Sequence, residues 1–411
     1  MIQSVPHLLI IKMINIKGGR ALNIKNNISK LYIILFFHNL IPAYVIERLF
    51  YEQRGMTVIM VVLCEIVYAV TIVILEIPTG ILADKFGRKP MLVTGAMLAM
   101  FEFVILLFAN QLWVFLLVTF LAGVSSACTS GSLHALLYDS LIMIKCEKSF
   151  ETIIGRLNAI DFIGAIIAAL SGSILANFYG FEFNYVLSAI SMFLAFIVTI
   201  LLVEPSITSS EGVDTNYSIK EYFLQSITFM KGNPRLLLIM IHAMAVGSCI
   251  KYLDEFWQLY LDEIGYSILF FGVFSAIISL ARIPGNLIAG YLVKYMKEET
   301  IITSILGSCV LGFIIAAGFQ NMVGIVAIIF IFIASGVVEP VILGYLHHNT
   351  KSEIRATVES IQSLIERTLS FIFGIGFGIV SSKINIIAGF AFLGFITLIF
   401  FSNLILIRLR R

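Results

Sequence analysis

Apolar runs of roughly 20 residues, separated by short polar breaks, cover almost the whole chain. A helix rises about 1.5 Å per residue, so each run is long enough to cross about 30 Å of hydrocarbon. The pattern predicts roughly twelve membrane-spanning helices, at residues 31–53, 57–79, 89–109, 112–139, 153–176, 183–203, 235–258, 267–293, 301–319, 322–346, 355–380 and 384–407. The predicted fold class is therefore an all-α integral membrane protein.

The longest polar break divides the predicted spans into two groups of six. It predicts two six-helix bundles, at residues 31–203 and 235–407, joined by a cytoplasmic linker at residues 204–234. Apolar residues recur at helical spacing in this linker, beside Lys220 and Glu221, which suggests a helix lying on the inner membrane surface.

Short segments of the two halves resemble each other at a nearly constant offset. The sequence IPTGILA at residues 77–83 has a counterpart in IPGNLIA at residues 283–289, which lacks the charges that follow the first copy. His38 and His242 are separated by a similar interval, as are Asp161 and Glu366. Such repetition is typical of transporters and predicts two pseudo-symmetric bundles.

Basic residues indicate how the chain lies in the membrane. Most of the 27 Lys and Arg residues fall in one set of breaks, whereas the opposite set contains only Arg54 and Lys383. The richer side is expected to be cytoplasmic, which places both termini in the cytoplasm. The expected location is the cell membrane, that is, the plasma or inner membrane. Both tryptophans, Trp113 and Trp257, then fall at the outer interface, where an amphipathic ring is favoured.

The ends of the chain are predicted to be short cytoplasmic segments, residues 1–30 and 408–411. The first of these is either a tail or an over-extended start, because Met13 could also initiate translation. An alternative is a basic surface helix held to anionic lipid.

Composition excludes several classes of protein. Of the 411 residues, 59% are hydrophobic, so the chain requires lipid around it. Only 13% are charged, which is about half the charged fraction of a soluble domain. The formal charge of +2 is too small to suggest nucleic acid. No G-x-x-x-x-G-K-[ST] motif is present for an ATP-driven pump, and the five cysteines have no metal-type spacing. We therefore expect a monomer with no enzymatic activity and no cofactor, whose partners are membrane lipid and a small-molecule substrate.

A charged loop with two glycines joins the second and third predicted spans, at residues 80–90. Gly80 and Gly87 permit a sharp turn and close helix approach. Asp84 lies near the inner boundary, Arg88 can fork onto a carboxylate, and Lys89 holds the loop on the cytoplasmic side. The alternative interpretation is a topological anchor without a gating role.

With its neighbouring spans, this loop has the form G-x-L-A-D-K-x-G-R-K and resembles the signature loop of the major facilitator superfamily. The resemblance implies a transporter in which the loop locks the two halves at the cytoplasmic face. It also implies an acidic partner at the end of helix 4, a place that Asp139 occupies, and a cavity lined by helices 1, 2, 4, 5, 7, 8, 10 and 11.

Span 5 tests the resemblance to the drug–proton antiporter branch, which carries G-x8-G-x3-G-P-x2-G-G. The chain matches this pattern in part and departs from it in part. Gly155, Gly164 and Gly172 match it, whereas Ala168, Ala169 and Ser173 replace a glycine, the proline and the last glycine. Small residues at this spacing also serve helix packing.

Ionisable residues inside the spans carry the mechanistic information, because each costs about 2.5 to 3.5 kcal/mol at mid-membrane unless it is paired or hydrated. Desolvation favours a protonated carboxyl and a nearby arginine favours a carboxylate, so a conformational change can move a proton. The predicted proton-coupling residues are Asp161 and Glu366, followed by Glu47, Glu65 and Glu339. Each could instead belong to a static ion pair.

Two further expectations concern charged residues in the spans. Arg282 and Glu339 are candidates for a static pair, and Glu102 ranks lower because span 3 usually packs outside the cavity in the family that the chain resembles. Polar residues on the expected cavity helices are candidates for substrate contact: His38, Asn39, His134, Asn158, His242, Arg282, Gln362 and Arg367.

The sequence thus predicts a secondary active transporter that works by alternating access. The excess of intramembrane acids favours a cation or a proton over an anion. The predicted activity is efflux of hydrophobic or cationic small molecules, driven by a proton or Na⁺ gradient. The alternatives are an importer of a nutrient or siderophore with the same fold and, more distantly, a sensor that does not transport.

Overall fold

The computed structural model describes residues 19–146, 149–205, 228, 230–349 and 355–410. These residues are almost entirely helical, and they contain 12 segments that are long and apolar enough to cross a membrane. The prediction of an all-α membrane protein is confirmed.

The helices agree closely with the predicted spans. The first half contains α2 (Gly19–Asn39), the 3-10 helix η1 (Pro42–Ile46), α3 (Glu47–Gln53), α4 (Val58–Phe86), α5 (Arg88–Leu106), α6 (Leu112–Met143), α7 (Phe150–Tyr179) and α8 (Phe181–Ile200). The second half contains α10 (Pro234–Glu263), α11 (Ile268–Tyr295), α12 (Glu298–Gly318), α13 (Met322–Asn349), α14 (Arg355–Lys383) and α15 (Ile386–Leu409).

The structure differs from the prediction at the start of the first span. The first helix begins at Gly19, well before residue 31, so the predicted tail at residues 1–30 is too long. The apolar residues between Ile24 and Leu31 pack into the first bundle, which extends the helix. The predicted surface helix of the linker lies largely outside the described residues.

The first span is broken instead of forming one continuous helix. It unwinds between Asn39 and Pro42, since proline lacks an N–H and disfavours a helical residue before it. Two α8 side chains satisfy the freed backbone: Asn184 donates to Pro42 O (3.0 Å), and Ser188 accepts from the next amide (3.1 Å). Irregular backbone at this depth is tolerated because protein surrounds it.

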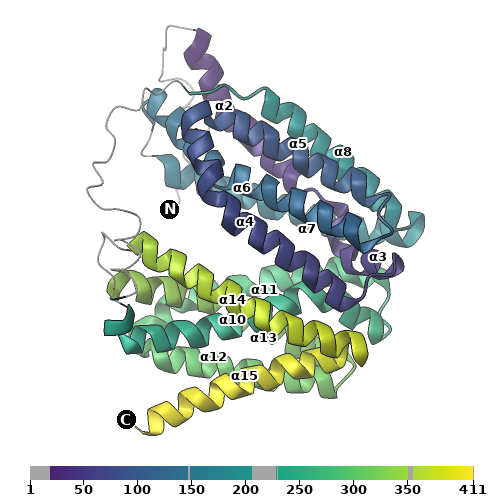
Figure 1. The fold of residues 1–411 in the computed structure, drawn as a ribbon, viewed down its shortest axis with the longest axis vertical. Coiled ribbons are helices and arrows are strands. Elements are labelled where there is room, and N and C mark those ends of the chain that lie inside the picture. The colour runs from purple at the N-terminus through teal and green to yellow at the C-terminus, as the bar shows by residue number, and fades with distance from the viewer. Residues whose placement is uncertain (1–18, 147–148, 206–227, 229, 350–354, 411) are drawn as a thin grey trace, which may run out of the picture.

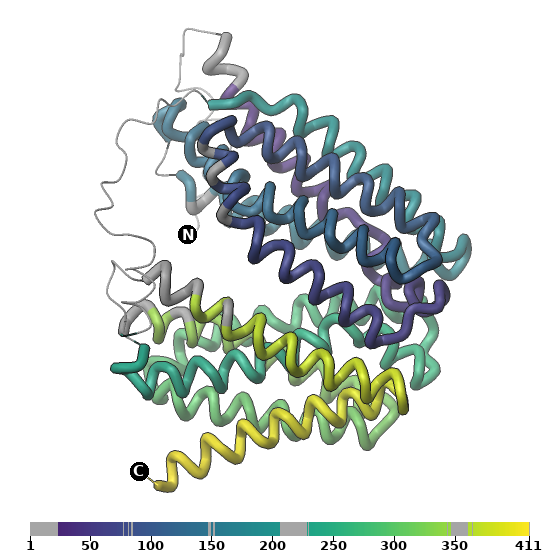
Figure 2. Tube along the Cα trace, in the orientation of Figure 1, coloured from purple at the N-terminus to yellow at the C-terminus, as the bar shows by residue number. Residues whose placement is uncertain are grey.

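The two halves meet at one end of the molecule and diverge toward the other (Figure 1). They diverge toward the end where α2 begins and α15 ends, and the Cα trace shows the same separation (Figure 2). At the closed end α4 contacts α14, where Ile59 N donates to Ser382 Oγ (2.9 Å). Gly272 of α11 packs so closely on α7 that a Cβ would clash with the Ala169 carbonyl.

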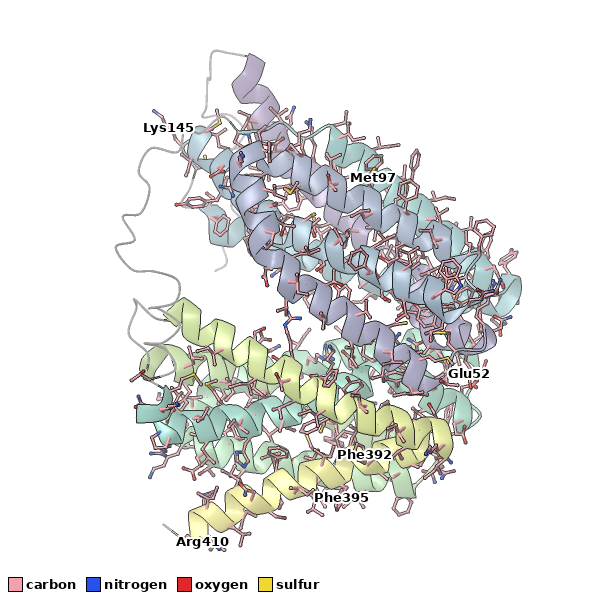
Figure 3. All side chains as sticks on the ribbon, in the orientation of Figure 1. Glu52, Met97, Lys145, Phe392, Phe395 and Arg410 are labelled. Carbon is pink, nitrogen blue, oxygen red and sulfur yellow. The ribbon has the colours of Figure 1, made fainter. Side chains whose placement is uncertain are left out.

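Side-chain positions mark the same two ends (Figure 3). Glu52 lies at the closed end, whereas Lys145 and Arg410 lie at the opposite, open end. Trp113 is 62% exposed, which suits the predicted membrane interface. The same prediction is wrong for Trp257, which is 4% exposed and packs against aromatic rings of α11.

Candidate functional site

Three cavities lie along the interior of the molecule. The central cavity, about 500 Å³, is lined by both halves, and its charged lining residues are Glu47, Arg48, Glu65, Glu102, Asp254 and Glu255. The cleft, about 580 Å³, lies between α4 and α14 and includes Lys251, Glu366 and Arg367. The side cavity, about 300 Å³, lies within the first half and includes His38, His134, Asn158 and Asp161.

A buried arginine connects the halves at the central cavity. The Arg48 guanidinium donates to Glu65 Oε1 (2.9 Å), to a Glu255 carboxylate oxygen and to the Glu255 carbonyl (3.0 Å), and it lies 3.8 Å from Glu47 Oε2. Gln258 reinforces this junction by accepting from Arg48 N (2.9 Å). Because Arg48 follows the break in span 1 and Glu255 lies on α10, this network joins the first bundle to the second.

A second ion pair lies on the other wall. Arg282 of α11 donates to Asp254 Oδ2 of α10 (2.7 Å), and its guanidinium lies 5.1 Å from the centre of the Phe332 ring. The predicted pair of Arg282 with Glu339 is therefore wrong. Glu339 is exposed on α13 and does not line any of the three cavities.

Glu102 lines the central cavity, contrary to the expectation that span 3 packs outside it. The described residues provide no basic partner within ion-pair distance of its carboxylate. Arg48 is already shared by three carboxylates, and Arg282 is paired with Asp254. The cavity therefore holds more acidic groups than neighbouring basic groups.

The structure brings together several predicted residues of the first half. Asp161 accepts a hydrogen bond from Asn39, which lines the central cavity, and Asp161 itself lines the side cavity. His38 lines both cavities, and His134 and Asn158 line the side cavity. These residues therefore lie around two adjoining cavities of the first bundle.

The predicted residues of the second half separate into two groups. Glu366 and Arg367 line the cleft with Lys251, whereas Gln362 lies outside the three cavities and its Oε1 is buried without a described partner. His242 does not line any of the three cavities, so its prediction as a cavity residue is wrong. It is 3% exposed and contacts Leu238 O (2.8 Å) and Asn403 Oδ1 (3.2 Å), so it packs against α15.

The charged loop between α4 and α5 lies at the open end. Arg88 Nε donates to Asp139 Oδ2 (3.1 Å), which is the acidic partner that the sequence indicated. Gly87 has φ 103°, a conformation that favours glycine. Gly80 and Lys89 occupy the two flanks of the turn, and the side chain of Asp84 lies outside the described residues.

Glu204 also contacts this loop, and the sequence did not indicate this contact. It follows α8 and accepts from Arg88 N (2.8 Å) and from Lys89 N (2.6 Å), at the N-terminus of α5. A carboxylate is stabilising there because it satisfies unpaired N–H groups and complements the helix dipole. No local pattern could indicate this contact, since the partners are 116 positions apart.

We expect Glu204→Ala to destabilise the open end of the first bundle by about 1 to 2 kcal/mol, because two helix N–H groups lose their acceptor. The melting temperature in detergent should fall by about 2 to 4 °C. Glu298→Ala is the matched control, since Glu298 lies in the first turn of α12. Equal shifts for both variants would contradict the capping role.

Two helical bundles of similar design that enclose a charged cavity define a membrane transporter. The chain belongs to the Major Facilitator Superfamily, whose family profile matches residues 31–375. The family expected from the charged loop is confirmed.

Several known proteins resemble this chain. It is 25% identical over 342 residues to the uncharacterized MFS-type transporter YxaM of Bacillus subtilis (strain 168), covering 77% of this chain and 79% of that protein. It is 29% identical over 211 residues to the multidrug resistance protein MdtG of Proteus mirabilis (strain HI4320), covering 50% of this chain and 48% of that protein. A mutant structure of the nucleoside transporter NupG shares the fold, with a TM-score of 0.75 at 16% identity, covering 92% of this chain and 99% of that chain.

Proposed function

We propose that this chain works by alternating access and exports hydrophobic cations in exchange for protons. The observation that carries this proposal is the acidic excess of the central cavity. Five carboxylates line it, from Glu47, Glu65, Glu102, Asp254 and Glu255, whereas the basic groups beside them are Arg48 and the Arg282 partner of Asp254. Unpaired carboxylates at this depth favour either bound protons or a bound cation.

The remaining lining of the central cavity suits a cation with a large apolar surface. Tyr44, Tyr51, Tyr68 and Trp257 contribute aromatic rings to it. Aromatic faces attract cations, most strongly where water is excluded. A siderophore or another anionic nutrient would meet the wrong sign of charge. The name of the relative MdtG, a multidrug resistance protein, also supports efflux.

Coupling follows if a cation and a proton compete for the same carboxylates. Protons that arrive from outside neutralise the cavity, and the cation that enters from the cytoplasm displaces them. Glu47, Glu65 and Glu102 are the nearest candidates for this exchange, and Glu366 of the cleft could extend it toward the cytoplasm.

Alternating access requires that the two ends of the molecule open in turn. With the basic loops in the cytoplasm, the structure represents an inward-facing state, since the halves meet at the opposite end. The Arg48–Glu255 junction must break when the outer end opens. In that state the charged loop, through Asp84 and Arg88, latches the inner ends together with Asp139 of α6.

The proposal is tested with two ions of matched size and opposite charge, tetraphenylphosphonium and tetraphenylborate. Inverted vesicles with an acidic interior should accumulate the cation above the level of vesicles that lack the protein, and they should show no such excess of the anion. A proton uncoupler should abolish the excess. Uptake restricted to right-side-out vesicles would instead favour an importer.

A further inference from the structure

The side cavity of the first half adjoins the central cavity but does not include residues of the second half. Helices α2, α5, α6, α7 and α8 supply its walls, together with Leu202 just beyond α8. The two cavities share His38, Thr129 and Met192 as lining residues, so they meet at these side chains. The two cavities therefore adjoin inside the first bundle.

The side cavity extends from the middle of the bundle to its cytoplasmic end. Leu92 lies in the first turns of α5, Ile154 lies in the first turns of α7, and Leu202 follows the end of α8. Asp161, which lines the cavity, is eleven residues from the start of α7, which corresponds to roughly 16 Å of helix. The cavity thus reaches from this depth to the side that carries the basic loops.

The ionisable and amide groups of this cavity lie close together in depth, whereas the lining nearer the starts of α5 and α7 is apolar. His134 and Asn158 line the part of the side cavity that is farther from the central cavity. Asp161 and His38 lie where the two cavities meet. Asn39 lines the central cavity and donates to the Asp161 carboxylate, so it connects the two spaces directly. A volume of about 300 Å³ is large enough for several water molecules, and the polar side chains of His38, Asn158 and Asp161 offer them hydrogen-bond partners.

We propose that the side cavity is a proton exit, through which protons leave the central carboxylates for the cytoplasm by way of His38 and Asp161. The proposal rests on the proton coupling proposed above. In the inward-facing state the entering cation occupies the central cavity between the halves. The displaced proton therefore leaves through a different cavity from the one that the cation occupies. The carboxyl O–H bond breaks and its oxygen keeps the electron pair. The proton binds water beside His38, then the Asp161 carboxylate, then water of the side cavity.

The functional test uses Asp161→Asn in proteoliposomes, with tetraphenylphosphonium as the probe. Proton movement per transported cation should fall by at least about tenfold, because the amide cannot accept and release the proton. Cation exchange at equal pH should fall much less. Asp262→Asn is the matched control, since Asp262 is exposed at the far end of α10.

An unchanged proton-to-cation ratio in Asp161→Asn would overturn the proposal. If the wild-type protein exchanges the cation without moving protons, the proposed coupling itself fails. The two failures are therefore distinguishable.

A second measurement tests the route without relying on transport. In a variant free of its native cysteines, Asn158→Cys and Ser126→Cys report on the side and central cavities, respectively. A small cationic thiol reagent is added to inverted vesicles, with and without saturating tetraphenylphosphonium. Bound cation should slow labelling of Ser126→Cys by about tenfold or more and leave Asn158→Cys reactive. Equal protection of both positions, or no reaction at Asn158→Cys, would overturn the separate route.

Discussion

Arg48→Gln is expected to abolish transport against a gradient and to open the outer end of the molecule. The Arg48 side chain is almost completely buried, and its guanidinium binds carboxylates from both halves. Removing one partner of a buried ion pair costs about 3 to 5 kcal/mol, because the remaining charges lose their compensation. This penalty falls on the inward-facing state, in which the halves are joined at Glu255. A change of this size shifts a two-state equilibrium by about two to four orders of magnitude.

The shift is measured as a distance between spin labels at Gln111 and Asn321, which lie in exposed loops at the closed end of each half. Arg48→Gln should lengthen this distance in the absence of substrate. Arg48→Lys should give an intermediate result, since an ammonium keeps the charge but cannot bind two carboxylates as a planar fork.

Arg54→Gln is the matched control, because Arg54 pairs with Glu182 of its own half. An Arg48→Gln protein that transports normally and keeps the wild-type distance would contradict the role of this junction.

Glu102→Gln is expected to lower the affinity for tetraphenylphosphonium by about 100-fold. The amide preserves the shape of the side chain and removes one unpaired negative charge from the central cavity. At an effective dielectric constant of about 20, a charge about 6 Å away contributes about 3 kcal/mol, or two orders of magnitude. Affinity for a neutral ligand of the same cavity should change much less.

Glu263→Gln provides the matched control, since Glu263 is exposed at the C-terminal end of α10. Binding is measured by equilibrium dialysis of the purified protein. Equal losses for the cation and for a neutral ligand would indicate altered packing instead of lost charge.

The architecture was largely predictable because the physical signals are local. Lipid requires long apolar runs, and these runs give twelve spans with edges close to those of the helices. The contact between Arg88 and Asp139 was also foreseen, but from the family resemblance and not from local chemistry. The break in span 1 had a single local signal, Pro42, which alone does not show whether a helix bends or unwinds.

The faces of the helices were less predictable than their positions. In a uniformly apolar span, hydrophobic periodicity cannot show which side lines a cavity. His242 therefore belonged to the predicted lining although it packs on α15, and Glu102 ranked low although it lines the cavity. The junction of Arg48 with Glu255 joins residues 207 positions apart and depends on how the two bundles dock.

Competition between cation and proton is tested most directly by proton release on binding. Tetraphenylphosphonium is added to the purified protein in a weakly buffered detergent solution, with a pH-sensitive dye as the reporter. We expect about one proton to be released per cation bound, and fewer in Glu102→Gln, because the cation displaces protons from the central carboxylates. Saturable binding of the cation without proton release, at any pH in the stable range, would contradict proton-coupled export by this site.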